Sequence, residues 1–223
     1  MKQTLFITGT DTGVGKTVLT ALLTRFLRDR GVNAAAFKPL CSGGRDDART
    51  LRTAMAGALT LNDINPWHFR AAIAPSLAAR LEEKSVKLAE VAAHGRVLQK
   101  RFEVLLVEGA GGLLSPLGKN FDSRDLIAAL RAKPIIVAQN KLGAVNHLRL
   151  TLEALPKGLR AQALVVLMSP PKPDIATRTN ARLLAEFFMR QQTFTLPWFG
   201  ERFSPPAALK LPPVRRALQQ LTG

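Results

Sequence analysis

Short apolar segments recur along the chain and alternate with longer segments of helical spacing. Apolar runs of about four to eight residues are typical of buried strands, whereas apolar residues three or four positions apart mark one face of a helix. We expect strands at 4–8, 34–37, 103–107, 134–138, 163–168 and 193–196. We expect helices at 17–30, 87–101, 124–131 and 176–191.

This alternation predicts an α/β protein with a mainly parallel central sheet and helices on both faces, that is, three layers. In such sheets, ligands bind beyond the carboxyl ends of the strands. No repeat, low-complexity tract or linker divides the 223 residues, so we expect one domain over residues 1–223. Prolines mark residues 169–174 and the tail after Pro205, and we expect loops there.

The first expected strand is followed by GTDTGVGKT at residues 9–17. Glycines let backbone N–H groups turn toward phosphate oxygens, and the start of the next helix adds its positive dipole end. In this phosphate-binding loop, or P-loop, Lys16 reaches the β- and γ-phosphates and the Thr17 hydroxyl holds Mg²⁺. The strict motif has glycine where this chain has Thr10, so the loop is a variant. The pattern predicts a P-loop NTPase-like fold that uses ATP.

Polar residues also follow three further strands. Lys38 comes after the second strand, Glu108 after the third and Asn140 after the fourth. A carboxylate that ends a strand opposite a P-loop threonine is a common second ligand of Mg²⁺, so we expect Glu108 to join Thr17 at the metal. The convergence of four strand ends predicts an active site at this edge of the sheet.

Cysteine and histidine add little to this site. Cys41 is the single cysteine and has no histidine near it in sequence, so we expect it to pack as a small side chain. His147 has no second histidine or cysteine at ligand spacing, and we expect it to form a hydrogen bond at a helix start.

Composition indicates a globular protein of the reducing cytoplasm, with 47% hydrophobic and 22% charged residues. A lone cysteine excludes an internal disulfide, and the first apolar stretch is too short for a signal or membrane helix. The net charge of +16 would attract polyanions. Because the cations are scattered and aromatic residues make up only 6%, we expect a basic surface suited to a phosphate-rich substrate, and no nucleic-acid partner.

Five segments together resemble the dethiobiotin synthetase family. They are TGTDTGVGKT at 8–17, FKPLCSG at 37–43, NPWHF at 65–69, LLVEGAGGLLSPL at 105–117 and KLGAVNH at 141–147. The P-loop is shared by many NTPases, but VEGAGG together with KLGAVNH is far more specific. The resemblance implies a sheet of about seven parallel strands. It also implies a cyclo-ligase that converts 7,8-diaminopelargonate and CO₂ to dethiobiotin through a carbamate that ATP phosphorylates, giving ADP and phosphate.

The resemblance also implies residue roles. Lys16 and Lys38 would stabilise the transferring phosphoryl group and the carbamate, with Thr12 and Ser42 orienting them. The nucleotide would contact Gly13, Val14, Gly15, Lys16, Thr17, Met168 and Pro197. The Mg²⁺ ligands would be Thr17, Asp47 and Glu108. The diamine would contact Thr12, Lys38, Ser42, Leu142, Gly143 and Asn146, and the active site would lie at a homodimer interface that Asn146 crosses.

Three positions depart from the family pattern. Met168 stands where relatives have an asparagine that reads the adenine edge, and a thioether is a poor hydrogen-bonding group, so we expect relaxed nucleotide choice. The loop after Ser42 is short, and either Asp46 or the adjacent Asp47 could be the metal ligand. Ser76 stands where relatives commonly have a histidine, and the sequence assigns it no role.

Two other functions fit parts of the pattern. A related ATP-dependent ligase, such as an amidating enzyme of cobalamin synthesis, needs a glutaminase-like segment with a catalytic cysteine, which this sequence lacks. A ParA- or MinD-like partitioning ATPase that binds DNA or membrane would suit the charge. Such ATPases carry an extra lysine early in the P-loop, where this chain has Asp11, and the tail PVRRALQQLTG is a poor membrane anchor.

Overall fold

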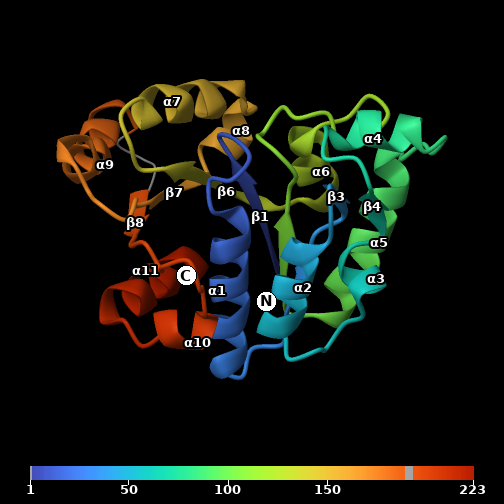
Figure 1. Ribbon diagram of the computed structural model, residues 1–223, viewed down its shortest axis with the longest axis horizontal. Coiled ribbons are helices and arrows are strands. Elements are labelled where there is room, and N and C mark those ends of the chain that lie inside the picture. The colour runs from blue at the N-terminus through green and yellow to red at the C-terminus, as the bar shows by residue number, and fades with distance from the viewer. Residues whose placement is uncertain (1, 189–192) are drawn as a thin grey trace.

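The computed structural model describes residues 2–188 and 193–223, and its centre is a six-stranded sheet in the order β2-β5-β1-β6-β7-β8 (Figure 1). Every neighbouring pair in this sheet is parallel. The strands are β1 (Gln3–Gly9), β2 (Ala34–Phe37), β5 (Val104–Glu108), β6 (Lys133–Gln139), β7 (Leu164–Met168) and β8 (Thr193–Leu196). All six apolar segments are therefore confirmed as strands.

The sheet has one strand fewer than the seven that the family resemblance implied. Two short strands, β3 (Leu40–Ser42) and β4 (Trp67–Phe69), pair in a separate parallel sheet of two strands. With only three residues each, they are too short to show a period in the sequence.

Helices cover both faces of the central sheet. They are α1 (Lys16–Asp29), α2 (Asp46–Ala54), α3 (Leu61–Ile64), α4 (Pro75–Leu81), α5 (Leu88–Arg101), α6 (Ser123–Leu130), α7 (Ala144–Ala154), α8 (Lys157–Arg160), α9 (Ile175–Phe187), α10 (Pro205–Ala208) and α11 (Pro212–Thr222). The four expected helices match α1, α5, α6 and α9. The expected end of the last one, at Gln191, lies outside the described residues. The loop at 169–174 is confirmed.

Two hydrophobic cores lie on opposite faces of the sheet. One is shared by α1, α10, α11 and alternate strand residues such as Leu5 and Ile7. The other is shared by α2, α5, α6 and α7 and by the strand residues in between, such as Phe6. Consecutive residues of β1 serve different cores because side chains of a strand alternate between its faces. Both faces are thus buried, which is why the strands are continuously apolar.

The tail after Pro205 is helical, so the expectation of a loop there was wrong. Pro205 and Pro212 occupy the first turns of α10 and α11, where a missing N–H costs nothing. Val214, Leu218 and Leu221 follow helical spacing and are buried beside α1 (Figure 1). Throughout the residues described, no helix combines the length and the apolar character needed to cross a membrane.

The parallel register brings the chemically interesting strand ends together. Ile7 of β1 is level with Glu108 of β5, and Phe37 of β2 is level with Val107. The residues that follow β1 and β2, and Glu108 at the end of β5, therefore meet at one edge of the sheet.

Candidate active site

The loop between β1 and α1 has the backbone of a phosphate-binding loop. Gly13 and Gly15 have φ angles of 71° and 101°, in the left-handed region that glycine enters without strain. No side chain caps the first turn of α1, so its free N–H groups and dipole are open to an anion. The Lys16 ammonium donates to the carbonyl oxygen of Asp11 at 2.7 Å and so bends back over the loop.

Lys16 lies in an unusual electrostatic setting. Burial lowers the pKa of its ammonium to about 8, against the opposing attraction of Glu108. A bound anion would favour the charged form and offset the cost of burying it. The lysine is therefore placed where a polyphosphate would stabilise it.

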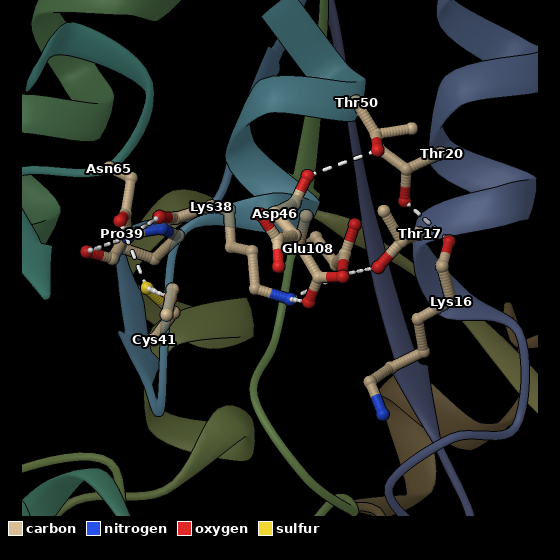
Figure 2. A network of polar contacts seen from close by, with 12 residues as sticks. Lys16, Thr17, Thr20, Lys38, Pro39, Cys41, Asp46, Thr50, Asn65 and Glu108 are labelled. Carbon is tan, nitrogen blue, oxygen red and sulfur yellow. Dashed lines mark hydrogen bonds and ion pairs between the residues drawn. The ribbon is translucent and has the colours of Figure 1, made fainter. Parts of the chain in front are cut away.

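Glu108 is the centre of a cluster of polar side chains from three further segments. Its Oε1 accepts from the Thr17 hydroxyl at 2.7 Å and from the Lys38 ammonium at 2.7 Å. The same ammonium donates to the Asp47 carboxylate. Figure 2 shows Glu108 between Lys38 and Thr17. Glu108 is fully buried, and its second oxygen, Oε2, has no partner among the described residues.

The charges in this cluster stabilise one another. Burial alone would lower the pKa of Lys38, but the carboxylates of Glu108 and Asp47 outweigh burial and raise it. Burial likewise works to raise the pKa of Asp47, but the adjacent Lys38 lowers it below the usual range. At neutral pH the pair is therefore an ammonium and a carboxylate.

The two adjacent aspartates, Asp46 and Asp47, have different partners, and only Asp47 belongs to this cluster. Asp47 points to Lys38, whereas the Asp46 carboxylate pairs with Arg49 at 2.6 Å with its side chain 92% exposed to solvent. Both residues begin α2, and a step of one position along a helix rotates the side chain to another face. Asp47 is the aspartate that the structure places beside Glu108 and Lys38.

A cavity of about 670 Å³ opens beside this cluster and the P-loop. The predicted site residues that line it are Thr12, Gly13, Gly15, Lys16, Thr17, Lys38, Ser42, Asp47 and Glu108. The segment 72–75 forms part of the wall, and Gly111 and Ser115 lie in the lining as well. Sequence reasoning did not single out these wall residues, although Gly111 and Ser115 belong to the LLVEGAGGLLSPL segment.

The Ser42 hydroxyl uses its proton within the protein and has only its lone pairs left for a ligand. Its hydroxyl donates to the carbonyl oxygen of Ile73 at 2.5 Å, which ties β3 to the wall of the cavity. The hydroxyl proton is thereby used, while the oxygen lone pairs remain. Ser42 can therefore accept a hydrogen bond from a ligand N–H group.

Six predicted site residues are not among those that line the cavity. Val14 is buried in the core with α1. Met168 ends β7, and its side chain packs against Gly15 of the P-loop. The contact is so close that a Cβ added at Gly15 would lie 2.9 Å from Met168 Cγ. Pro197 follows Leu196, the β8 partner of Met168. The remaining three, Leu142, Gly143 and Asn146, are exposed at the start of α7.

Cys41 packs in the interior as expected, whereas at the helix start His147 forms a backbone hydrogen bond. Cys41 is buried, as expected, but it also lines the cavity, and its thiol lies 2.9 Å from the carbonyl oxygen of Gly44 and 3.0 Å from Asn65 Oδ1, which both accept from it. The His147 backbone N–H donates to the carbonyl oxygen of Gly143 as α7 begins, while its side chain is exposed. Ser76 lies beside the cavity wall, where its N–H donates to the carbonyl oxygen of Pro116.

Comparisons with known proteins decide the family. A family model described as "AAA domain" matches residues 3–201. The chain is 42% identical over 199 residues to the ATP-dependent dethiobiotin synthetase BioD of Anaeromyxobacter dehalogenans (strain 2CP-C), covering 87% of this chain and 89% of that one. The chain belongs to the dethiobiotin synthetase family. Relatives of the same name in Akkermansia muciniphila and Bacillus velezensis are 39% and 36% identical, and cover 83% and 82% of this chain and 87% and 81% of their own.

Solved structures of other classes share only the fold with this member of the dethiobiotin synthetase family. A ParA family ATPase from Chlorobium tepidum TLS superposes with a TM-score of 0.60 at 12% identity, covering 98% of this chain and 96% of that one. The MinD cell division protein of Aquifex aeolicus gives 0.62 at 14% identity, covering 99% and 97%. These likenesses confirm the P-loop NTPase-like architecture and carry no argument for partitioning.

Proposed function

We propose that this chain is an ATP-dependent dethiobiotin synthetase, which closes a ureido ring on 7,8-diaminopelargonate with CO₂ through a phosphorylated carbamate. The observation that carries the proposal is the single cavity that the P-loop lines on one side and Lys38 and Ser42 line on the other. A phosphoryl donor and an anionic acceptor would meet there. Phosphoryl transfer needs such positioning and charge neutralisation more than a covalent catalyst.

The P-loop would bind the phosphates of ATP. The uncapped start of α1 and the backbone of Gly13 and Gly15 supply N–H donors. Lys16, whose ammonium rests on the Asp11 carbonyl, would turn to the β- and γ-phosphates. Val14 would contribute only its backbone N–H, because its side chain packs in the core.

The oxygen atoms of Thr17, Asp47 and Glu108 fit a magnesium ion. All three are hard ligands of the kind that Mg²⁺ prefers, and the unpartnered, buried Oε2 of Glu108 supports a cation there. When bound, Mg²⁺ would neutralise charge on the nucleotide phosphates.

Lys38, Thr12 and Ser42 would hold the acceptor. One amine of the diamine adds to CO₂ and loses a proton, which gives a carbamate anion. Lys38 would stabilise that anion, because its neighbours keep the ammonium charged. The lone pairs of Ser42 would accept from an amine N–H, since its proton is held by Ile73.

Ring closure then follows in two steps. A carbamate oxygen attacks the γ-phosphorus, so the bond between that phosphorus and the bridging oxygen breaks and ADP leaves. The second amine attacks the carbonyl carbon, the carbon–oxygen bond to phosphate breaks, and the amine loses a proton. Lys16 and Lys38 would stabilise the negative charge that develops on the oxygens in both steps.

The diamine site would be completed by a second subunit. Leu142, Gly143 and Asn146 lie at the exposed start of α7, and the Leu142 side chain is 84% exposed. Exposed apolar side chains on one region support a protein interface. Further ones lie on α7, on α9 and just before Ser115, namely Leu114, Leu150, Ile175 and Phe187. We propose a homodimer in which these α7 residues reach the diamine of the neighbouring subunit.

The basic surface would serve small anions. The net charge of +16 raises the local concentration of ATP and of the carboxylate-bearing diamine, and no nucleic-acid partner is needed to account for it. A single cysteine is compatible with a reducing cytoplasm, where we place this enzyme.

The test is which additive stimulates ATP turnover. We expect release of ADP to depend on both diaminopelargonate and bicarbonate, with dethiobiotin formed in equal amount, because the γ-phosphoryl group needs the carbamate as its acceptor. Duplex DNA and anionic vesicles serve as controls and should have no effect. Stimulation by DNA or vesicles with none by the diamine would support a partitioning ATPase instead.

A further inference from the structure

A buried amide lies directly behind the acceptor side of the cavity. Asn65 follows α3 and is fully buried. Its Nδ2 donates to the carbonyl oxygens of Lys38 at 2.8 Å and Pro39 at 3.5 Å. Its Oδ1 accepts from Arg45 Nε at 3.2 Å and lies 3.0 Å from Cys41 Sγ, whose one proton it shares with the carbonyl oxygen of Gly44 at 2.9 Å. Figure 2 shows Asn65 beside Pro39 and Cys41, on the side of Lys38 away from the P-loop.

These contacts use the full hydrogen-bonding capacity of an asparagine, which has two donors and an oxygen with two lone pairs. The surroundings are asymmetric, with two carbonyl oxygens on one side and a thiol and a guanidinium on the other. Burial raises the pKa of Cys41, so the thiol keeps the proton for which Asn65 Oδ1 and the Gly44 carbonyl oxygen are both acceptors. An aspartate here would replace the Nδ2 donor with an oxygen that faces two carbonyl oxygens, and an apolar residue would leave buried polar groups unpaired.

Arg45 extends the anchor to the helix that carries Asp47. One of its terminal nitrogens, Nη2, donates to the carbonyl oxygens of Leu61 at 2.6 Å and Asn65 at 2.8 Å. The other, Nη1, donates to the Asn62 side chain at 3.1 Å. Arg45 immediately precedes α2, whose second residue is Asp47. α3 and the residue that follows it, Asn65, thus hold the start of α2 in place.

The site therefore consists of two halves with different anchors. Lys38 and Asp47 approach Glu108 from different segments, and both segments are attached to Asn65, one directly and one through Arg45. The P-loop is held separately, between β1 and α1, and the side-chain hydrogen bonds of Asn65 go to other segments. Among the described residues that line the cavity, Asn65 is absent, so it would not touch a ligand.

We propose that Asn65 is a positioning residue for the acceptor half of the site, which keeps Lys38 and the Asp47 helix at the spacing that phosphoryl transfer to the carbamate requires. This inference rests on the proposed function. A misplacement of about 1 Å at a reacting group costs about a hundredfold in rate, so loosening this anchor has a large effect without loss of any group that binds substrate.

The test compares Asn65→Asp and Asn65→Ala with Asn62→Ala. Asn62 is the same residue type, lies on α3 just before Asn65 and contacts the same arginine, but its hydrogen bond does not reach the Lys38 segment. Isothermal titration with ADP counts the nucleotide sites, and kcat is expressed per site, so unfolded molecules do not lower it. Both Asn65 variants should lose about a hundredfold in kcat and show a raised KM for the diamine, whereas ADP affinity stays within about twofold of the unmodified protein. Asn62→Ala should stay within about twofold of the unmodified protein, because Arg45 keeps its hydrogen bonds to Leu61 and Asn65.

Two results would overturn the inference, and they differ from a failure of the proposed function. A kcat per nucleotide site equal to that of the unmodified protein would mean that Asn65 supports folding alone. A parallel loss of ADP affinity would mean that it supports the whole site rather than the acceptor half. An unmodified protein that binds ADP but makes no dethiobiotin would reject the proposed function itself, and the positioning role would fail with it.

Discussion

At the scale of single residues, two buried polar groups of the site, on Glu108 and Lys16, are incompletely paired. Glu108 is fully buried and uses one oxygen for Thr17 and Lys38, which leaves Oε2 without a described partner. Lys16 is buried with a lowered pKa, and its ammonium donates a hydrogen bond to a backbone carbonyl oxygen. Both groups would be better satisfied with a nucleotide and its cation present. Such incomplete pairing is typical of a binding site rather than of a structural core.

Met168 carries a prediction at this scale, about the choice of nucleotide. It packs against Gly15 of the P-loop and offers only a thioether, which cannot hydrogen-bond the edge of a base strongly. We expect Michaelis constants for ATP, CTP and GTP within about tenfold of one another. Met168→Asn should favour ATP, because an amide can read the adenine edge, while Met168→Leu should keep the relaxed profile. Strict ATP preference in the unmodified protein would refute this account.

At the scale of elements, short segments decide how the site is assembled. α2 brings Asp47, α3 ends just before Asn65, and β3 brings Ser42, yet none of them is longer than nine residues. α3 depends on its capping box, in which the Thr60 hydroxyl and the Asp63 carboxylate satisfy each other's backbone N–H groups. These elements are held by tertiary contacts and caps rather than by helical propensity.

α11 carries a prediction about stability. Leu218 lies at its centre, fully buried among α1, β8 and the strand residues of the same core. Leu218→Ala should reduce the free energy of unfolding by about 2 to 5 kcal/mol, because the cavity left behind is only partly filled. Gln219→Ala, on the exposed side of the same helix, should change it by less than about 0.5 kcal/mol. Equal urea midpoints for the two variants would show that the tail does not support the core.

The sequence predicts the long elements and the phosphate half of the site, but not the short ones. Continuous apolar runs identify all six strands of the central sheet because both of its faces are buried. The P-loop is visible because its chemistry is local in sequence. Asn65 is not, because its partners lie 20 to 27 residues away and its role appears only when four segments converge. The prolines of the tail were misleading because their effect depends on whether they begin a helix or interrupt one.

At the scale of the whole molecule, one fold supports very different functions. ParA and MinD proteins share the architecture at 12% and 14% identity, so the arrangement of strands does not identify the reaction. In this chain the cavity adds Lys38 and Ser42 to the P-loop, and we propose that this acceptor side determines the reaction. The central claim is therefore that the γ-phosphoryl group is transferred to a carbamate and not to water.

The fate of a bicarbonate oxygen tests this claim most directly. In unlabelled water, oxygen-18 bicarbonate labels the carbamate, and the carbamate oxygen that attacks phosphorus leaves with phosphate when the ring closes. In a rapid turnover with ATP and diaminopelargonate, we expect mass spectrometry to find oxygen-18 in inorganic phosphate in step with the formation of dethiobiotin. Unlabelled phosphate would show that water receives the phosphoryl group and would contradict the account.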